Sequence, residues 1–115
     1  IFVEDIVRGL IACALQGNPG EAYNLASGVE ISILELANLI NELTRNNMPV
    51  DLRPARDWDR SGKRFGSTEK SKEQLGFEAN IGIREGMKRT IEWTVENQEH
   101  INHSISQHNV FMHSC

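Results

Sequence analysis

The sequence contains no apolar run of the length that a membrane-spanning helix needs, which is about 20 residues. It also lacks the apolar N-terminal segment of a signal peptide and any long run of basic residues. With a formal net charge of −4, the chain offers little general attraction to the phosphates of a nucleic acid. These absences argue against a membrane protein, and against nucleic acid as the main partner.

Cysteine is scarce, with only Cys13 and Cys115 in 115 residues. Two thiols so far apart in sequence favour a reduced protein, and we expect a cytoplasmic location. Cys13 falls within an apolar helical pattern and has no cation beside it in sequence. We therefore interpret it as a small core residue and not as a nucleophile.

Motifs for catalysis and for metal binding are missing as well. The four histidines all lie between positions 100 and 113, without the Cys or carboxylate residues that would complete a set of metal ligands. Residues 17–20 contain two glycines, but they follow a helix and include Pro19. A dinucleotide-binding loop has the reverse order, strand to helix. The sequence therefore predicts no catalytic residue, no metal ligand and no cofactor loop.

Four segments have helical patterns. The first, from about residue 4 to 15, carries an apolar stripe that we expect to form a buried face. That stripe consists of Ile6, Val7, Leu10, Ile11 and Ala14. The second helix begins with a capping box of Ser32 and Glu35 and runs to about Thr44. Ser67 is expected to cap a short third helix that ends at Leu75, and the last helix spans about residues 83 to 96.

Two short segments, residues 22–25 and 50–53, are predicted as strands. Residues 1–3 resemble the end of another strand with no initiator Met before it, which indicates a piece of a longer protein. After Asn97 the chain is polar, and we expect residues 97–115 to form an irregular, mobile tail behind a lobe of residues 1–96. The order of elements predicts an α/β fold, or a small α+β lobe.

A local reversal of charge lies between Arg53 and Arg64. Five of the twelve Lys and Arg residues fall in this stretch of an otherwise acidic chain: Arg53, Arg56, Arg60, Lys63 and Arg64. Arginine binds phosphate through a bidentate fork, and Pro54 and Gly62 suit a loop of fixed shape. The segment is interpreted either as a loop that receives an anionic ligand or as a solvated basic loop.

Six patterns occur in one order along the chain. Residues 2–10 are similar to an aromatic-Val-x-Asp-apolar segment that opens a helix, and residues 23–28 to a Tyr-Asn-Leu-Gly-Ser-Gly strand and turn, with Ala26 in place of the first Gly. Residues 32–37 match the following helix start, residues 54–59 match a Pro-x-Arg-x-x-Asp loop, and residues 70–77 and 84–93 complete the order. In this order the chain resembles the C-terminal portion of the NAD-dependent nucleotide-sugar epimerase/dehydratase family, the extended short-chain dehydrogenase/reductases.

This resemblance implies a C-terminal substrate-binding lobe that closes over a nucleoside diphosphate sugar, while a separate N-terminal Rossmann lobe holds NAD. It implies that Arg56 contacts the diphosphate of the substrate and that Asp59 reaches a ribose hydroxyl. Asp5 corresponds to the family's helix-opening aspartate, which we interpret as a structural cap.

The family's glycine-rich dinucleotide loop and its Tyr-x-x-x-Lys pair are missing from this sequence, in which Ser27 stands four residues after the only tyrosine, Tyr23. We therefore expect a substrate lobe that neither binds NAD nor catalyses by itself. Two functions stay open: a fragment of an NAD-dependent nucleotide-sugar enzyme, or a non-catalytic binding or assembly module derived from that family. Apolar surface around residues 1–3 and the first helix is expected to be uncovered in isolation. The missing Rossmann lobe or a second copy of the chain would cover it.

Overall fold

The structure is a computed structural model that describes residues 1–54 and 66–108. Its helices are α1 (Val3–Gln16), α2 (Ile33–Thr44), α3 (Glu69–Leu75), α4 (Ile83–Glu96) and α5 (Gln98–Gln107). The first four confirm the helices that the sequence predicts. None of the helices in these residues has both the length and the apolar character needed to cross a membrane.

The predicted strands are wrong. Residues 22–25 and 50–53 form no strand, residues 1–3 lead directly into α1, and no strand occurs anywhere in residues 1–54 and 66–108. The predicted α/β or α+β class is therefore replaced, for the described part of the chain, by an arrangement of helices joined by extended segments.

Hydrogen bonds to α3 explain why residues 22–25 are extended without being a strand. Lys70 Nζ donates to the carbonyl oxygen of Ala22 at 2.9 Å, and Ser71 Oγ donates to the carbonyl oxygen of Asn24. Ser71 is fully buried at this contact. Backbone carbonyls that accept from side chains of a helix need no neighbouring strand to satisfy them.

The chemistry of helix ends was predicted correctly in α2 and nearly so in α3. The Ser32 hydroxyl accepts from the Glu35 backbone N–H at 3.1 Å, and the Glu35 carboxylate accepts from the Ser32 N–H at 2.7 Å, which confirms the capping box. Gly76 ends α3 at φ 60°, a left-handed conformation that glycine adopts readily. Thr68, and not Ser67, occupies the position before α3, and no side chain caps that helix.

The chain after Asn97 is not irregular throughout, because residues 98–107 form α5. The prediction of an irregular tail is wrong for this stretch. Polar side chains with few β-branched residues are compatible with a helix, and α5 also packs against α4. The division into a lobe of residues 1–96 and a tail of residues 97–115 stays a prediction.

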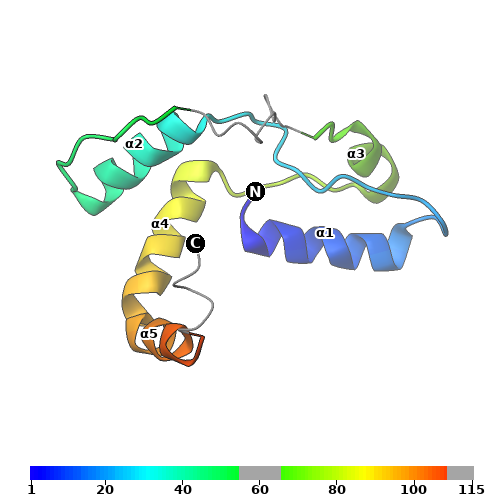
Figure 1. The fold of residues 1–115 in the computed structure, drawn as a ribbon. Helices are drawn as coiled ribbons and strands as arrows, with labels where there is room; N and C mark the ends of the chain where they lie inside the picture. The colour runs from blue at the N-terminus through cyan, green and yellow to red at the C-terminus, as the bar shows by residue number, and fades with distance from the viewer. Residues whose placement is uncertain (55–65, 109–115) are drawn as a thin grey trace.

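The helices fall into two sets, which Figure 1 shows on either side of the N-terminus. In the α1–α3 pair the two helices pack on each other, and in the α4 group α2 and α5 each pack on α4. The Cα radius of gyration is 17.7 Å, against about 13 Å for a compact domain of this length. The molecule is therefore open, with the two sets held together by contacts near the N-terminus.

The packed face of α1 is the face with small residues. A Cβ atom on Gly9 would lie 2.8 Å from both terminal methyl carbons of Leu25 and 3.0 Å from the ring of Phe77. Leu75 and Phe77 are the buried hydrophobic residues of the described chain. The absence of a side chain at position 9 is what allows α1 to approach this small core.

The larger apolar stripe of α1 faces solvent. Val7, Leu10 and Ile11 are 49%, 58% and 54% exposed, and Ala14 is exposed too, so the predicted buried face is wrong at these four positions. Ile6 alone among the five predicted residues is half-buried. In the described residues no element lies over the stripe to bury it, as we expected for the chain in isolation.

We predict that Gly9→Val destabilises the chain by about 1–3 kcal/mol, the usual cost of overpacking a filled site. Ala14→Val is the matched control, since it introduces the same side chain on the exposed face of the same helix. Urea denaturation followed by circular dichroism measures both. Helix propensity favours Gly9→Val and disfavours Ala14→Val, so a loss of stability in Gly9→Val no larger than that in Ala14→Val would contradict the contact with Leu25 and Phe77 as its cause.

Candidate functional site

The two residues predicted to bind substrate, Arg56 and Asp59, lie outside the described residues, together with the rest of the segment 55–65. The structure does describe the chain on either side. Arg53 Nε donates to Asp51 Oδ2 at 2.9 Å, with both side chains exposed. The structure therefore describes no contact of either predicted site residue. We call residues 55–65 the basic segment, and the structure describes only its two flanks.

The two flanks of residues 55–65 lie against different sets of helices. On the first flank, Asn41 Nδ2 on α2 donates to the Met48 carbonyl oxygen at 3.0 Å, and the chain then runs back past α2 (Figure 1). On the second flank, Asn24 Nδ2 donates to the Ser67 carbonyl oxygen at 3.4 Å. The basic segment thus connects the α4 group to the α1–α3 pair.

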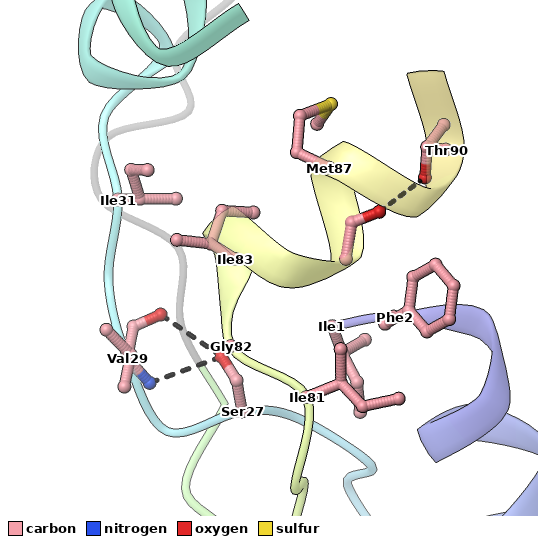
Figure 2. A pocket seen from close by; sticks show the side chains of 11 residues that line it. Ile1, Phe2, Ser27, Val29, Ile31, Ile81, Gly82, Ile83, Met87 and Thr90 are labelled. Carbon is pink, nitrogen blue, oxygen red and sulfur yellow. Dashed lines mark hydrogen bonds between the residues drawn. The ribbon is translucent and has the colours of Figure 1, made fainter. Parts of the chain in front are cut away.

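An apolar hollow of about 390 Å³ opens where the start of α1, residues 27–31 and the start of α4 meet (Figure 2). Apolar side chains dominate its lining, chiefly Ile1, Phe2, Ile31, Ile81, Ile83 and Met87. The hollow lies directly beside the contacts that hold the two sets of helices together.

The two hydroxyl groups that line the hollow already have partners. Ser27 Oγ lies 3.3 Å from both the nitrogen and the carbonyl oxygen of Val29, and Thr90 Oγ1 donates to the Gly86 carbonyl oxygen at 2.9 Å (Figure 2). A phosphate or a sugar buried here would lose its hydration with little hydrogen bonding in return. The hollow therefore suits apolar groups and not a nucleotide.

A buried carboxylate fixes the chain that enters α4. Asp5 is fully buried, and its two oxygens accept hydrogen bonds from the backbone N–H groups of Asn80 at 3.1 Å and Ile81 at 2.9 Å. Arg8 forms an ion pair with the same carboxylate at 2.6 Å and donates to the Glu78 carbonyl oxygen at 2.8 Å. We call Asp5, Arg8 and residues 78–81 the Asp5 cluster.

The interpretation of Asp5 as a cap is wrong. It lies in the first turn of α1, where no side chain makes a capping hydrogen bond, and its partners are 75 and 76 positions away in sequence. Burial by itself raises the pKa of Asp5. Hydrogen bonds from Asn80, Ile81 and Arg8, with the charge of Arg8, more than offset this, so the pKa lies below its ordinary value.

Two further contacts join the α1–α3 pair to the α4 group. The Phe2 side chain lies against Gly86, where a Cβ atom would come within 3.0 Å of the ring. Arg89 on α4 forms an ion pair with Glu4 at 3.0 Å and lies over the Phe2 ring, with its guanidinium carbon 5.7 Å from the ring centre. Gly86 thus permits the close approach that places the wall of the hollow.

The remaining candidate residues show no catalytic arrangement. Cys13 is a free, half-buried thiol, and the Tyr23 hydroxyl hydrogen-bonds Gln74 at 3.0 Å. His103 Nε2 lies 2.9 Å from Gln107 Nε2 on α5. In residues 1–54 and 66–108 no three His, Cys, Asp or Glu residues come together as metal ligands.

Sequence reasoning missed the Asp5 cluster and the hollow. The available signal was an aspartate within the first turn of an apolar helix, which has an ordinary explanation in the helix dipole. Its partners at 80 and 81 contribute backbone N–H groups, which leave no mark in the sequence. Gly86 lies within the pattern of residues 84–93, and its contact with Phe2 explains why glycine suits that position.

No protein-family model matches the chain. Solved structures are similar to it: WbmF of Bordetella bronchiseptica, in a complex with NAD+ and UDP, is 53% identical, with a TM-score of 0.82 over 96% of this chain and 33% of that one. The epimerase Mth375 of Methanothermobacter thermautotrophicus is 46% identical, with a TM-score of 0.84 over 90% of this chain and 31% of that one. Among curated proteins, the dTDP-D-glucose 4,6-dehydratase of Bos taurus is 29% identical over 107 residues, 84% of this chain and 29% of the dehydratase.

The chain matches the C-terminal portion of the NAD-dependent nucleotide-sugar epimerase/dehydratase family. The resemblance inferred from the six sequence patterns is thereby confirmed. The chain spans about a third of the length of the family members that it matches. Of the two buried polar side chains in the described residues, Asp5 makes three hydrogen bonds and Ser71 makes two.

We predict that Asp5 contributes an acid-sensitive part of the stability. Because its pKa is lower in the folded chain than in the unfolded one, this contribution is present above the unfolded value of about 4 and is lost as the pH falls through the folded pKa. In Asp5→Asn the contribution is absent at neutral pH, so the stability difference from the unmodified chain should shrink on acidification. Urea denaturation between pH 7 and pH 3 measures it.

Glu4→Gln is the matched control for this titration, since it removes a carboxylate from the adjacent, exposed position of the same helix turn. Its stability should follow the pH dependence of the unmodified chain closely. A stability difference between Asp5→Asn and the unmodified chain that stays constant with pH would contradict the assignment.

Proposed function

We propose that the chain is the substrate-binding C-terminal portion of an NAD-dependent nucleotide-sugar epimerase or dehydratase, and that it clamps the diphosphate of a nucleoside diphosphate sugar. The observation that carries this proposal is the 53% identity to WbmF over 96% of the chain, because that protein was solved with NAD+ and UDP. A likeness at this level over nearly the whole chain makes a similar ligand the simplest inference.

The clamp is assigned to Arg56, with Asp59 at a ribose hydroxyl. Charge distribution supports this choice, because the cations of the described chain are largely neutralised. Apart from Arg45, each described Lys and Arg lies 2.5 to 3.9 Å from a carboxylate: Arg8, Arg53, Lys70, Lys72, Arg84, Lys88 and Arg89. A diphosphate is bound by clustered cations, and the sequence of residues 55–65 holds four Lys or Arg in eleven residues.

The sequence lacks the motif with which a Rossmann lobe holds NAD. The glycine-rich loop that approaches a dinucleotide pyrophosphate is missing from the sequence, and the lining of the hollow is apolar, with both of its hydroxyls already partnered. The contribution of this chain is therefore to hold substrate. The dinucleotide and the catalytic Tyr-x-x-x-Lys pair would come from other residues of the full-length protein.

We predict that Arg56→Ala in the full-length protein weakens UDP binding by about 1.5–3 kcal/mol, the range for a charge-assisted hydrogen bond. Arg53→Ala is the matched control: it removes the same charge three residues earlier, where the guanidinium is exposed and paired with Asp51. Isothermal titration calorimetry with UDP measures both variants.

The three possible results are distinct. A loss confined to Arg56→Ala supports the clamp, and equal losses in both variants would indicate general attraction to a basic loop. If the unmodified full-length protein does not bind UDP, the non-catalytic binding or assembly module becomes the better explanation.

We also propose that the apolar stripe of α1 is covered in the full-length protein, either by the dinucleotide-binding lobe or by a second copy. Val3, Val7, Leu10, Ile11 and Leu15 are 62%, 49%, 58%, 54% and 77% exposed and recur at helical spacing along one side of α1. A contiguous apolar face of this length is typical of an interface.

We predict that residues 1–115 expressed alone self-associate and bind an apolar dye, and that Val7→Lys with Leu10→Lys reduces both. Leu52→Lys is a control, because that side chain is 73% exposed and does not belong to α1. Sedimentation velocity and dye fluorescence measure the outcome. A dye-free monomer before any substitution would argue against a covered stripe.

A further inference from the structure

The two sets of helices are joined by few contacts. The packed helix pairs of the described chain are α1 with α3, α2 with α4, and α4 with α5, so no helix of one set packs along a helix of the other. The connections are the Asp5 cluster, the contact of Phe2 with Gly86, and the ion pair of Arg89 with Glu4. Their relative strengths therefore determine how firmly the two sets are placed.

Of these connections, the Asp5 cluster constrains geometry most. The ion pair of Arg89 and Glu4 is exposed on both sides, and such pairs contribute little. The Phe2 contact is apolar and has no preferred direction. Asp5 instead makes two directional, charge-assisted hydrogen bonds from a fully buried position, and Arg8 holds a third backbone group of the same four-residue stretch.

The stretch held by Asp5 leads directly into α4. Ile81 is followed by Gly82, the residue before α4, and Arg84 in the first turn of α4 forms a bidentate ion pair with Glu42 on α2, at 2.8 and 2.7 Å. Fixing residues 80 and 81 therefore fixes the start of α4, and α2 with it.

We propose that Asp5 is a positioning residue, which sets the α4 group against the α1–α3 pair and so fixes the spacing of the two flanks of the basic segment. One flank lies on α2 through Asn41, and the other on residues 24–28 through Ser67. The consequence for ligand binding rests on the proposed function. The effect on the spacing of the helices does not.

Spin labels test the spacing directly. Asn38 on α2 and Glu73 on α3 are exposed, belong to different sets, and are changed to cysteine for labelling after Cys13→Ala and Cys115→Ala. In Asp5→Asn the side-chain NH2 group would face one of the groups that donate to the carboxylate, so either the Asn80 or the Ile81 N–H loses its acceptor. In the full-length protein we expect the label-to-label distance distribution to broaden by about twofold or to shift, as local opening increases.

Glu4→Gln is the matched control and should leave the distance distribution unchanged, although it also removes a carboxylate from the first turn of α1 and breaks a contact between the two sets. Should Asp5→Asn not fold, Asp5→Glu replaces it. It keeps the negative charge, but the added methylene displaces the carboxylate from the backbone N–H groups of Asn80 and Ile81. A folded variant at position 5 with an unchanged distribution would overturn the proposal.

UDP binding supplies the second readout. We expect Asp5→Asn to weaken UDP about tenfold, equivalent to about 1.4 kcal/mol, with Glu4→Gln unchanged. Failure of the unmodified protein to bind UDP would overturn the proposed function. The label-to-label distances alone would then decide whether Asp5 positions the helices. Tight UDP binding by a variant with a broadened distribution would overturn the link between helix spacing and the ligand.

Discussion

The buried carboxylate of Asp5 is the interaction on which the arrangement of this chain depends. Removing a carboxylate from water costs several kcal/mol unless its lone pairs are used, and here two backbone N–H groups and the Arg8 guanidinium use them. The two backbone donors, Asn80 and Ile81, are 75 and 76 positions away in sequence and directly precede the start of α4. A single turn of α1 thereby fixes the entry of a helix from the other set and the wall of the hollow that this helix supplies.

So much depends on one group because the rest of the chain buries little. Leu75 and Phe77 are its buried hydrophobic residues, whereas the apolar stripe of α1 and Trp93 and Val95 on α4 face solvent. A chain with a radius of gyration of 17.7 Å cannot rely on a central core to hold its helices in register. Directional polar contacts take over that task, and the exposed apolar surface is what a larger assembly would bury.

Four of the five described helices were predictable from this sequence, and the reason is local. The capping box at Ser32 and the left-handed Gly76 act within a few residues, so their signals survive without knowledge of the fold. The strand predicted at 22–25 was wrong because a short apolar segment indicates only an extended conformation, and here α3 side chains satisfy its backbone carbonyls. The predicted burial of the α1 stripe was wrong for a related reason: hydrophobic periodicity identifies an apolar stripe, but none of the described elements covers it. The Asp5 cluster was out of reach, since its donors are backbone groups.

Polar and apolar functions occupy different parts of the chain. Nearly all described cations are already paired with carboxylates, and the hollow at the start of α4 has an apolar lining in which both hydroxyls are partnered. Under the proposed function an anionic ligand binds the basic segment, residues 55–65, whereas the apolar hollow and the α1 stripe offer surface for contact with protein. The Asp5 cluster contacts the chain that leads into α4, whose first residues line the hollow. If this cluster sets the spacing of the two sets of helices, a change at residues 78–81 alters both the hollow and the spacing of the two flanks of the basic segment. Contact with protein at the hollow and ligand binding at the basic segment are then coupled.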